Sequence, residues 1–557
     1  MLKLPPAPRM SGRSLRSVVR ATAAKPVAKV LSALMRKDLG VAAALALPAH
    51  LRSPMPLSFA AVQARAERDA QDAALGAPPP PSALPSAASW HERYADKSTT
   101  PVEVVERAIA EARRLAGARP RMGCFTVIDE PGALRDAEAS AERWARGEPI
   151  SPLDGVVVPV KEEVDILGHG YRLGTEFTPA SDALEDGTSV ARLRAKGAII
   201  LGHTIMTEMG MSPLGGNIHR PVPRNAHAVD RLPGGSSTGS GIAVASGLCP
   251  VALGTDGGGS VRIPACFNGL FGLKPTFGRI SRHGDGFGGT MDHLGPIGAS
   301  ARDLAVFIEI AGGPDVNDPL THGSPEIIGG ELVSALGRGV EGLRIGVLPG
   351  EMMAADQEIQ DACSEALSAL ERAGAVLVDV TIPLARHAPG LGYLTIGLET
   401  YTGLLDARRH HFDKMGPDLQ MLMRLLSTFP SGDYLDAQGL RATLRTQCAE
   451  VLRDVHVFAM PTTASVAPEV TALELEEGFA DTPALHAACR FSFLGNLTGL
   501  PCGTAPVGSG EAGLPVGLQI VGDAFDEASV LAVLAHLERS EVARVRRPRV
   551  PVYPLGS

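Results

Sequence analysis

The chain has few of the features that mark secreted, metal-binding or nucleic-acid-binding proteins. Its 557 residues contain seven cysteines, an odd number without a C-x-x-C pair, which argues against a disulfide scaffold and favours a reducing compartment. A net charge of −9 gives no general attraction to nucleic acid. No cluster of histidines and cysteines has metal-ligand spacing. We therefore expect a cytoplasmic protein with no metal, no cofactor and no nucleic-acid partner.

Long hydrophobic runs are absent from the N-terminal region. The apolar run at 41–48 is too short to span a bilayer, and residues 1–37 carry nine lysines or arginines and no acidic residue. Prolines at 78–81 mark a linker. We expect a basic extension and linker at 1–85 with a helix at 58–75, a main domain at 86–545 and a tail at 546–557. The extension is typical of a flexible or packing arm, with a transit peptide or a membrane-surface helix as alternatives.

Glycine is abundant, and two of its clusters carry serines. The first spans 234–240 with Ser236 and Ser237, and the second spans 254–260 and ends in Ser260. Consecutive glycines let successive N–H groups converge on one point, which is the arrangement that an oxyanion hole needs. A small-residue helix at 239–247 and a buried strand at 251–255 are expected between them. Ser236 and Ser237 would then precede a helix N-terminus, where developing negative charge is favoured.

A nucleophilic serine needs a proton acceptor, and a lysine is the best candidate. Residues 155–160 predict a buried strand that ends in Lys161. Burial disfavours the ammonium form, so a neutral amine can act as the base and a Ser-Ser-Lys relay results. The alternative is a structural lysine paired with an acidic residue at 162, 163 or 165. The histidines at 203, 219 and 227 have no clear tie to either loop.

At these residues the chain resembles the amidase signature enzymes. The resemblance rests on the block from 234–237 through 254–260 to 272–276, on the strand that ends in Lys161, and on the segments 460–463, 496–501 and 513–522. It covers residues 86–545. It implies an α/β fold in which helices surround a central mixed β-sheet, preceded here by an N-terminal helical extension.

The resemblance also implies a role for each site residue. It places the acyl-enzyme nucleophile on Ser260, a bridging cis-serine on Ser236 and the general base on Lys161. The other implied groups are the oxyanion N–H groups of Gly257, Gly258, Gly259 and Ser260, a substrate contact at Gly210, and supporting side chains at Ser237, Asp256 and Arg262. The chain departs from the family in having Glu162-Glu163 where Asp-Asn is usual, and Gly257 where Thr or Ile is usual. Because the base must be uncharged, activity is expected to rise toward mildly alkaline pH.

The expected substrate is a small-molecule amide. The motifs are most similar to those of plant-type fatty acid amide hydrolases and their bacterial relatives, which implies an apolar acyl chain, as in an N-acylethanolamine. Alternatives are a broad-specificity amidase, an aryl acylamidase, a carbamate hydrolase and an A-type amidotransferase subunit, although such subunits typically read Arg-Gln-Pro at 262–264. The methionines at 206, 209 and 211 fit either an acyl channel or core packing. Peripheral membrane contact through the extension and a homodimer stay open.

Two unrelated functions compete with this interpretation. Residues 235–239 fit the G-x-S-x-G elbow of an α/β-hydrolase with Ser237 as nucleophile, but that elbow follows a strand and 225–233 is turn-like. A phosphate-binding loop at 234–241 would lack the Gly-Lys-Ser/Thr ending of a P-loop.

Overall fold

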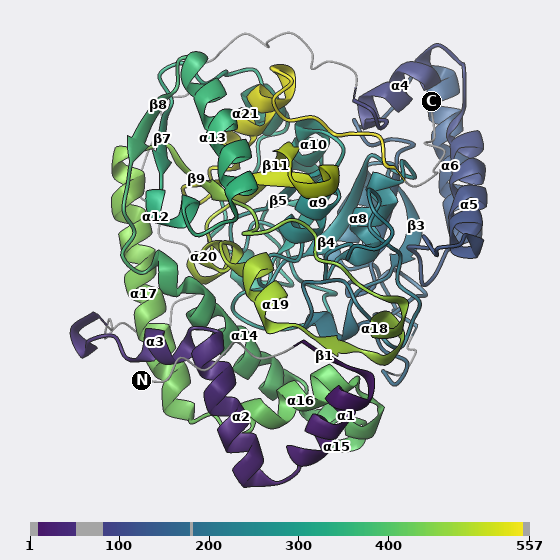
Figure 1. Cartoon of the computed structure of the whole chain (residues 1–557). Coiled ribbons are helices and arrows are strands. Elements are labelled where there is room, and N and C mark those ends of the chain that lie inside the picture. The colour runs from purple at the N-terminus through teal and green to yellow at the C-terminus, as the bar shows by residue number, and fades with distance from the viewer. Residues whose placement is uncertain (1–8, 52–81, 179–181, 550–557) are drawn as a thin grey trace.

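The computed structural model describes residues 9–51, 82–178 and 182–549 (Figure 1). The helix expected at 58–75 and the proline linker at 78–81 lie outside these ranges, as do the last eight residues of the chain. The first eight residues and 179–181 are also outside them.

A ten-stranded mixed sheet forms the centre of the described chain. Its strands follow the order β3, β2, β4, β6, β5, β11, β12, β9, β7, β8, with parallel neighbours toward the two edges and antiparallel neighbours in the middle. The bounds are β2 Val157–Lys161, β3 Ile199–Thr204, β4 Val251–Thr255, β5 Phe271–Lys274, β6 Leu294–Gly298, β7 Arg344–Val347, β8 Val376–Asp379, β9 Val457–Pro461, β11 Cys502–Ser509 and β12 Pro515–Gly522. A separate pair joins β1 (Met10–Ser11) to β10 (Phe479–Ala480).

Helices surround this sheet (Figure 1). Strands β2, β3, β4 and β9 are buried at every residue, as expected for strands that are covered on both faces. The helices are α1 Gly12–Ala21, α2 Lys25–Asp38, α3 Val41–Leu45, α4 Ala87–Ala95, α5 Pro101–Gly117, α6 Glu130–Arg146, α7 Thr188–Ala195, α8 Thr238–Ala245, α9 Arg262–Phe267, α10 Ala301–Ala311, α11 Glu331–Ala335, α12 Pro349–Met352, α13 Gln357–Arg372, α14 Ala388–Gly403, α15 Leu405–His410, α16 Pro417–Leu426, α17 Ser431–Asp454, α18 Ala472–Glu477, α19 Thr482–Cys489, α20 Ser492–Thr498 and α21 Glu527–Arg539. The α/β fold expected from the sequence is confirmed.

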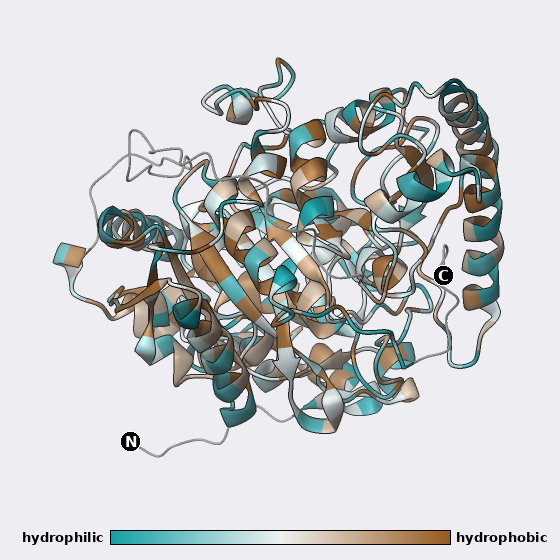
Figure 2. Ribbon diagram, turned by 90° about the horizontal axis from the view of Figure 1, so that it is seen from above, coloured by the Kyte–Doolittle hydropathy of each residue, from teal (hydrophilic) through white to brown (hydrophobic). Residues whose placement is uncertain are grey.

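Local sequence signals place several of these elements. The small-residue helix and the strand expected between the two serine loops are α8 and β4. Both α8 and α9 are buried along their whole lengths, and the glycine, alanine and serine residues of α8 allow it to approach the sheet closely. The outer helices are instead striped in polar and apolar colours, which is typical of helices that bury one face (Figure 2).

The N-terminal extension packs on the main body. Helices α1 and α2 contact α16, α3 contacts α14 and α17, and β1 pairs with β10 (Figure 1). Its basic side chains meet acidic partners at 2.6–3.1 Å: Arg9 with Glu474, Arg16 with Glu477, and Arg36 with Asp433. Residues 9–51 therefore pack against the main body of the described chain. Within the described ranges, no helix combines the length and the apolar character needed to cross a bilayer.

Candidate active site

Lys161 is the last residue of β2, and its side chain is fully buried. Strand β2 runs parallel to β4, with Val160 opposite Leu253, so their carboxyl ends meet at one edge of the sheet. That edge brings Lys161 Nζ to 2.8 Å from Ser236 Oγ and to 2.5 Å from Thr255 Oγ1. A buried amine is thus held against a serine hydroxyl, which is the contact that a base needs.

The two serine loops are joined directly. The Ser237 N–H donates to the Ser260 carbonyl at 3.3 Å. The Ser237 hydroxyl donates to the Thr255 carbonyl at 3.1 Å and accepts the Thr255 N–H at 3.2 Å, which fixes the first loop to the end of β4. The peptide bond between Gly235 and Ser236 is cis. Ser237 is therefore engaged with backbone, and no strand precedes it at 225–233, which does not fit a nucleophile elbow.

Ser260 lies two residues before α9 and is 7% exposed. It lines two cavities. The smaller, of about 30 Å³, is also lined by Ser236, Thr255 and Glu163. The larger, of about 190 Å³, extends along α14 and α16 and has a mainly apolar lining. The predicted nucleophile and the predicted bridging serine thus face one cavity, and Lys161 contacts the bridging serine.

The glycines before Ser260 differ in what their N–H groups do. Gly259 takes a φ of +118°, and its N–H donates to Asp256 Oδ1 at 2.7 Å. This bond engages the Gly259 N–H, contrary to the expectation that it faces an oxyanion. Within the described chain, the N–H groups of Gly257, Gly258 and Ser260 have no hydrogen-bond acceptor, so they stay the predicted oxyanion donors.

Gly210 and two neighbouring methionines lie beside these serines. Gly210 lines both cavities, and a Cβ at this residue would lie 3.6 Å from Ser236 Oγ. Met211 lines both cavities and Met209 lines the smaller one, whereas Met206 is fully buried. Met209 also packs in a hydrophobic cluster with Leu419. This residue therefore both lines a cavity and contributes to core packing.

Asp256 and Arg262 form a fully buried ion pair beneath the second loop. Arg262 binds both oxygens of Asp256, at 2.8 and 2.9 Å, and donates to Asn496 and to Gln519 at 2.7 Å. Asp256 accepts the N–H groups of Gly259 and Val261. Burial alone would raise the pKa of Asp256, but the charge and hydrogen bonds of Arg262 outweigh it and hold that pKa well below its usual range. The pair therefore anchors the loop that ends in Ser260.

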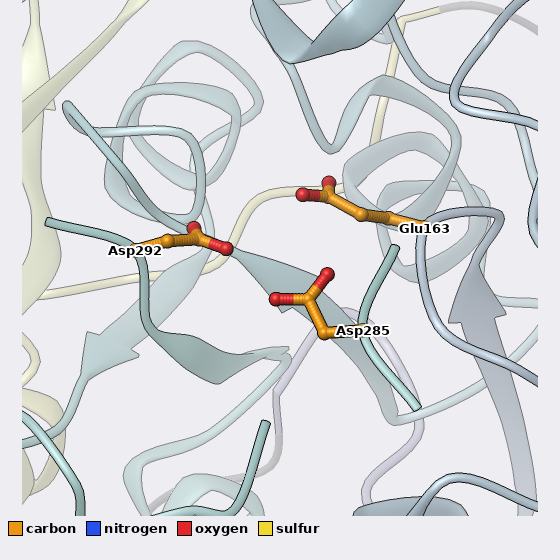
Figure 3. A group of neighbouring side chains, drawn as sticks. All are labelled: Glu163, Asp285 and Asp292. Carbon is orange, nitrogen blue, oxygen red and sulfur yellow. The ribbon is translucent and has the colours of Figure 1, made fainter. Parts of the chain in front are cut away.

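Three carboxylates lie close together just after the end of β2 (Figure 3). Glu163 follows β2, whereas Asp285 and Asp292 belong to the loop between β5 and β6, and oxygens of all three lie within 4.8 Å of one another. Lys161 Nζ lies 2.5 Å from Glu163 Oε2. Burial, with the neighbouring Glu163 carboxylate, raises the pKa of Asp292 to about 6, and burial with both neighbouring carboxylates raises that of Asp285 well above its usual range.

Three clustered carboxylates can hold a cation in principle. Here the Lys161 amine lies 2.5 Å from Glu163 Oε2 and supplies a positive counter-charge at the position that a cation would take. We therefore assign no metal to this cluster.

The histidines considered from the sequence contact neither serine. His203 Nε2 lies 2.8 Å from the Val164 carbonyl, His219 pairs with Glu208, and His227 contacts the Asn268 carbonyl. Burial lowers the pKa of His203 to about 4 and that of His227 below its usual value. These rings have structural roles.

Sequence reasoning missed Thr255, Asp285, Asp292 and Asn496 as parts of the site. The sequence did contain a signal for Thr255, because this residue ends a buried strand as Lys161 does. The carboxyl ends of parallel strands lie at the same edge of a sheet, so the two residues could have been expected to lie close together. The aspartates had none, because they belong to an irregular loop that only the fold brings to β2.

Comparison with known proteins identifies the family. The amidase family pattern matches residues 103–531. A fatty acid amide hydrolase from Medicago truncatula is 34% identical over 465 residues, covering 82% of this chain and 76% of that protein. The A subunit of a glutamyl-tRNA(Gln) amidotransferase from Roseiflexus castenholzii is 33% identical over 478 residues, covering 81% of this chain and 95% of that protein. The structure of a bacterial aryl acylamidase has a TM-score of 0.73 at 27% identity, covering 82% of this chain and 96% of that chain. The chain is an amide-hydrolysing enzyme that belongs to the amidase signature family.

Proposed function

We propose that this enzyme is a serine hydrolase that cleaves amides of apolar acyl chains through an acyl-enzyme on Ser260. One observation carries the proposal: the buried Lys161 amine contacts Ser236, and Ser236 shares a cavity with Ser260. The same amine lies 2.5 Å from Glu163, which is the structural pairing considered from the sequence, but that ion pair does not require the further contact with a serine hydroxyl, whereas base catalysis does.

The reaction follows from these positions. Neutral Lys161 accepts the proton of Ser236, which accepts that of Ser260 as the Ser260 oxygen bonds to the amide carbon. The carbonyl oxygen becomes an oxyanion and is stabilised by the N–H groups of Gly257, Gly258 and Ser260. The C–N bond breaks while the relay returns the proton to the leaving amine. Water then attacks the ester carbon while the same relay accepts a proton from the water. The bond to the Ser260 oxygen breaks, that oxygen takes the proton back, and the carboxylic acid is released.

The larger cavity supports an apolar acyl group. From Ser260 it runs between α14 and α16, past Ile396, Leu422 and Leu425. Met35 and Leu39 of the N-terminal extension contribute to its wall. Burying methylene groups against such a lining contributes about 0.8 kcal/mol each, so affinity should rise with chain length until the cavity is full. The similarity to a fatty acid amide hydrolase points to the same substrate class.

Narrowing this cavity should penalise long chains selectively. Met421 on α16 is half-buried and lines the larger cavity but not the smaller one. Met421→Trp is expected to lower kcat/KM for a long-chain acyl amide by about 10-fold or more, equivalent to roughly two methylene contacts, and to spare a two-carbon acyl amide. The measurement is kcat/KM across a series of acyl chain lengths on one amine.

Met353→Trp is the matched control, because Met353 is 70% exposed and lines neither cavity. Its chain-length profile should equal that of the wild type. An equal loss for short and long chains in Met421→Trp would mean that the larger cavity does not hold the acyl group.

A hydrolysis panel tests the function as a whole. The purified chain should cleave long-chain N-acyl amines faster than aryl amides, carbamates or glutamine, and a fluorophosphonate should label Ser260. Preference for an aryl acyl amide would favour the activity named for the aryl acylamidase structure. Glutamine hydrolysis that appears only with partner proteins would favour an amidotransferase role, as in the Roseiflexus relative.

A further inference from the structure

We propose that Glu163 is a positioning residue for the catalytic lysine: its carboxylate accepts one N–H of Lys161 and so directs the lone pair of the amine toward Ser236. The proposal rests on the proposed function, because it assigns a role within the same relay. Glu163 stands at one of the positions where the sequence departs from the pattern described above for the amidase signature enzymes.

Two hydrogen bonds and one ion pair surround Lys161 Nζ, and they favour one arrangement for a neutral amine. The nitrogen has three neighbours: Ser236 Oγ at 2.8 Å, Thr255 Oγ1 at 2.5 Å and Glu163 Oε2 at 2.5 Å. The Thr255 hydroxyl donates its single proton to Glu163 Oε2 at 2.7 Å, so toward the lysine it can only accept. An ionised Glu163 also only accepts. The two N–H bonds of a neutral amine therefore go to Thr255 and Glu163, and the lone pair faces Ser236.

The same contacts serve the charged state that forms during the reaction. When the Ser236 proton moves to Lys161, a new N–H bond forms and the O–H bond of Ser236 breaks. The resulting ammonium has three N–H groups and three acceptors in place. Its positive charge lies 2.5 Å from the Glu163 carboxylate, in a site from which water is largely excluded. Glu163 thus orients the base before proton transfer and stabilises the charge after it.

Of the three clustered carboxylates, Glu163 is the one in contact with the lysine amine. Asp285 and Asp292 approach it from the loop between β5 and β6 (Figure 3), and Arg282 of that loop lies close enough to act on both. The loop is fixed beside Glu163, because the Gly286 N–H donates to the Glu163 carbonyl at 2.7 Å. Ser236 and Thr255, which approach from the loop before α8 and from β4, carry no charge. Glu163 is the carboxylate that contacts Lys161 Nζ directly, at 2.5 Å.

Glu163→Gln removes the charge and keeps the shape and one acceptor oxygen. A negative charge beside an amine favours the ammonium, so its removal lets the amine become neutral at lower pH. The ascending limb of kcat/KM against pH should move down by about 1–3 units. The plateau should fall by about 10- to 100-fold, because the ammonium formed in the transition state loses its counter-charge. The measurement is kcat/KM from pH 5 to 10 on a medium-chain acyl p-nitroanilide, with active enzyme counted by fluorophosphonate labelling.

Glu162→Gln is the matched control. Glu162 is equally buried and adjacent in sequence, but it pairs with Arg220 at 2.7 Å and has no contact with Lys161. In Glu162→Gln, the midpoint of kcat/KM against pH should stay at the wild-type value, even if the substitution changes the stability of the protein. Glu163→Asp keeps the negative charge but moves the carboxylate oxygens away from Lys161. The midpoint of its kcat/KM profile against pH should therefore stay near the wild-type value, while the plateau of kcat/KM should be lower.

A midpoint that does not move in labelled, folded Glu163→Gln would overturn the proposal, because a purely structural glutamate changes only the amount of active enzyme. Failure of the proposed function looks different, since the wild type would then cleave no amide and Ser260 would not be labelled. If Glu163→Gln does not fold, the Glu163→Asp profile decides: a plateau equal to that of the wild type would contradict a positioning role.

Discussion

Ser260→Ala is expected to lower kcat/KM for every amide substrate by about 10⁴-fold or more and to abolish labelling by a fluorophosphonate. Removing the attacking oxygen removes the acyl-enzyme path, whereas the oxyanion donors and the substrate cavities remain. Since Ser260 is 7% exposed and its hydroxyl has no hydrogen-bond partner in the described chain, the variant should keep the wild-type free energy of unfolding within about 1 kcal/mol. Steady-state kinetics and denaturant unfolding measure the two effects separately.

Ser237→Ala is the discriminating companion. Its hydroxyl fixes the loop to Thr255, so its loss should destabilise the protein while Ser260 is still labelled. The reverse pattern, with activity retained in Ser260→Ala and lost in Ser237→Ala, would revive a nucleophile elbow and contradict the proposed mechanism.

Arg262→Ala is expected to have the largest effect on stability. The variant leaves Asp256 as an unpaired carboxylate with no solvent exposure, and it also removes the donors to Asn496 and Gln519. Breaking a buried pair by removing one partner costs about 3–5 kcal/mol. The pKa of Asp256 is held low in the folded state, so this stabilisation is present at neutral pH and is lost only as pH falls below about 4. Denaturant unfolding at pH 7 measures it.

A peripheral ion pair provides the comparison. Arg372 contacts Glu365 at 2.8 Å, and the two side chains are 64% and 72% exposed, so Arg372→Ala should cost no more than about 1 kcal/mol. Equal losses in the two variants would mean that the Asp256–Arg262 pair is screened by water, contrary to its burial.

The sequence allowed prediction of the parts of the site that depend on local pattern. A buried strand ending in Lys161 and two glycine-serine loops could be identified because apolar runs and glycine clusters are local features. The register of β2 on β4, which places Lys161 opposite the end of that strand, follows from parallel pairing. The helix after Ser260, α9, is not among the elements expected from the sequence; its proline at 264 lies in the first helical turn, where proline is tolerated.

What could not be predicted depends on long-range packing. The engagement of the Gly259 N–H by Asp256 needs the loop geometry, and a run of glycines allows many such geometries. The substitution at Glu163 is visible in the sequence, but its contact with Lys161 and the approach of Asp285 and Asp292 require the loop between β5 and β6 to fold over β2. Similarly, the basic composition of the N-terminal extension gave no sign that its arginines meet acids of α17, α18 and the segment after β10.

The pairing of β1 with β10 has a consequence for how the protein folds. Met10 lies opposite Ala480, so this strand pair joins two segments that are far apart in the sequence. Closing so long a stretch of chain is slow compared with forming local contacts. The wall that Met35 and Leu39 add to the larger cavity therefore depends on contacts that close a long stretch of chain, those of α2 with α16 and of α3 with α14 and α17.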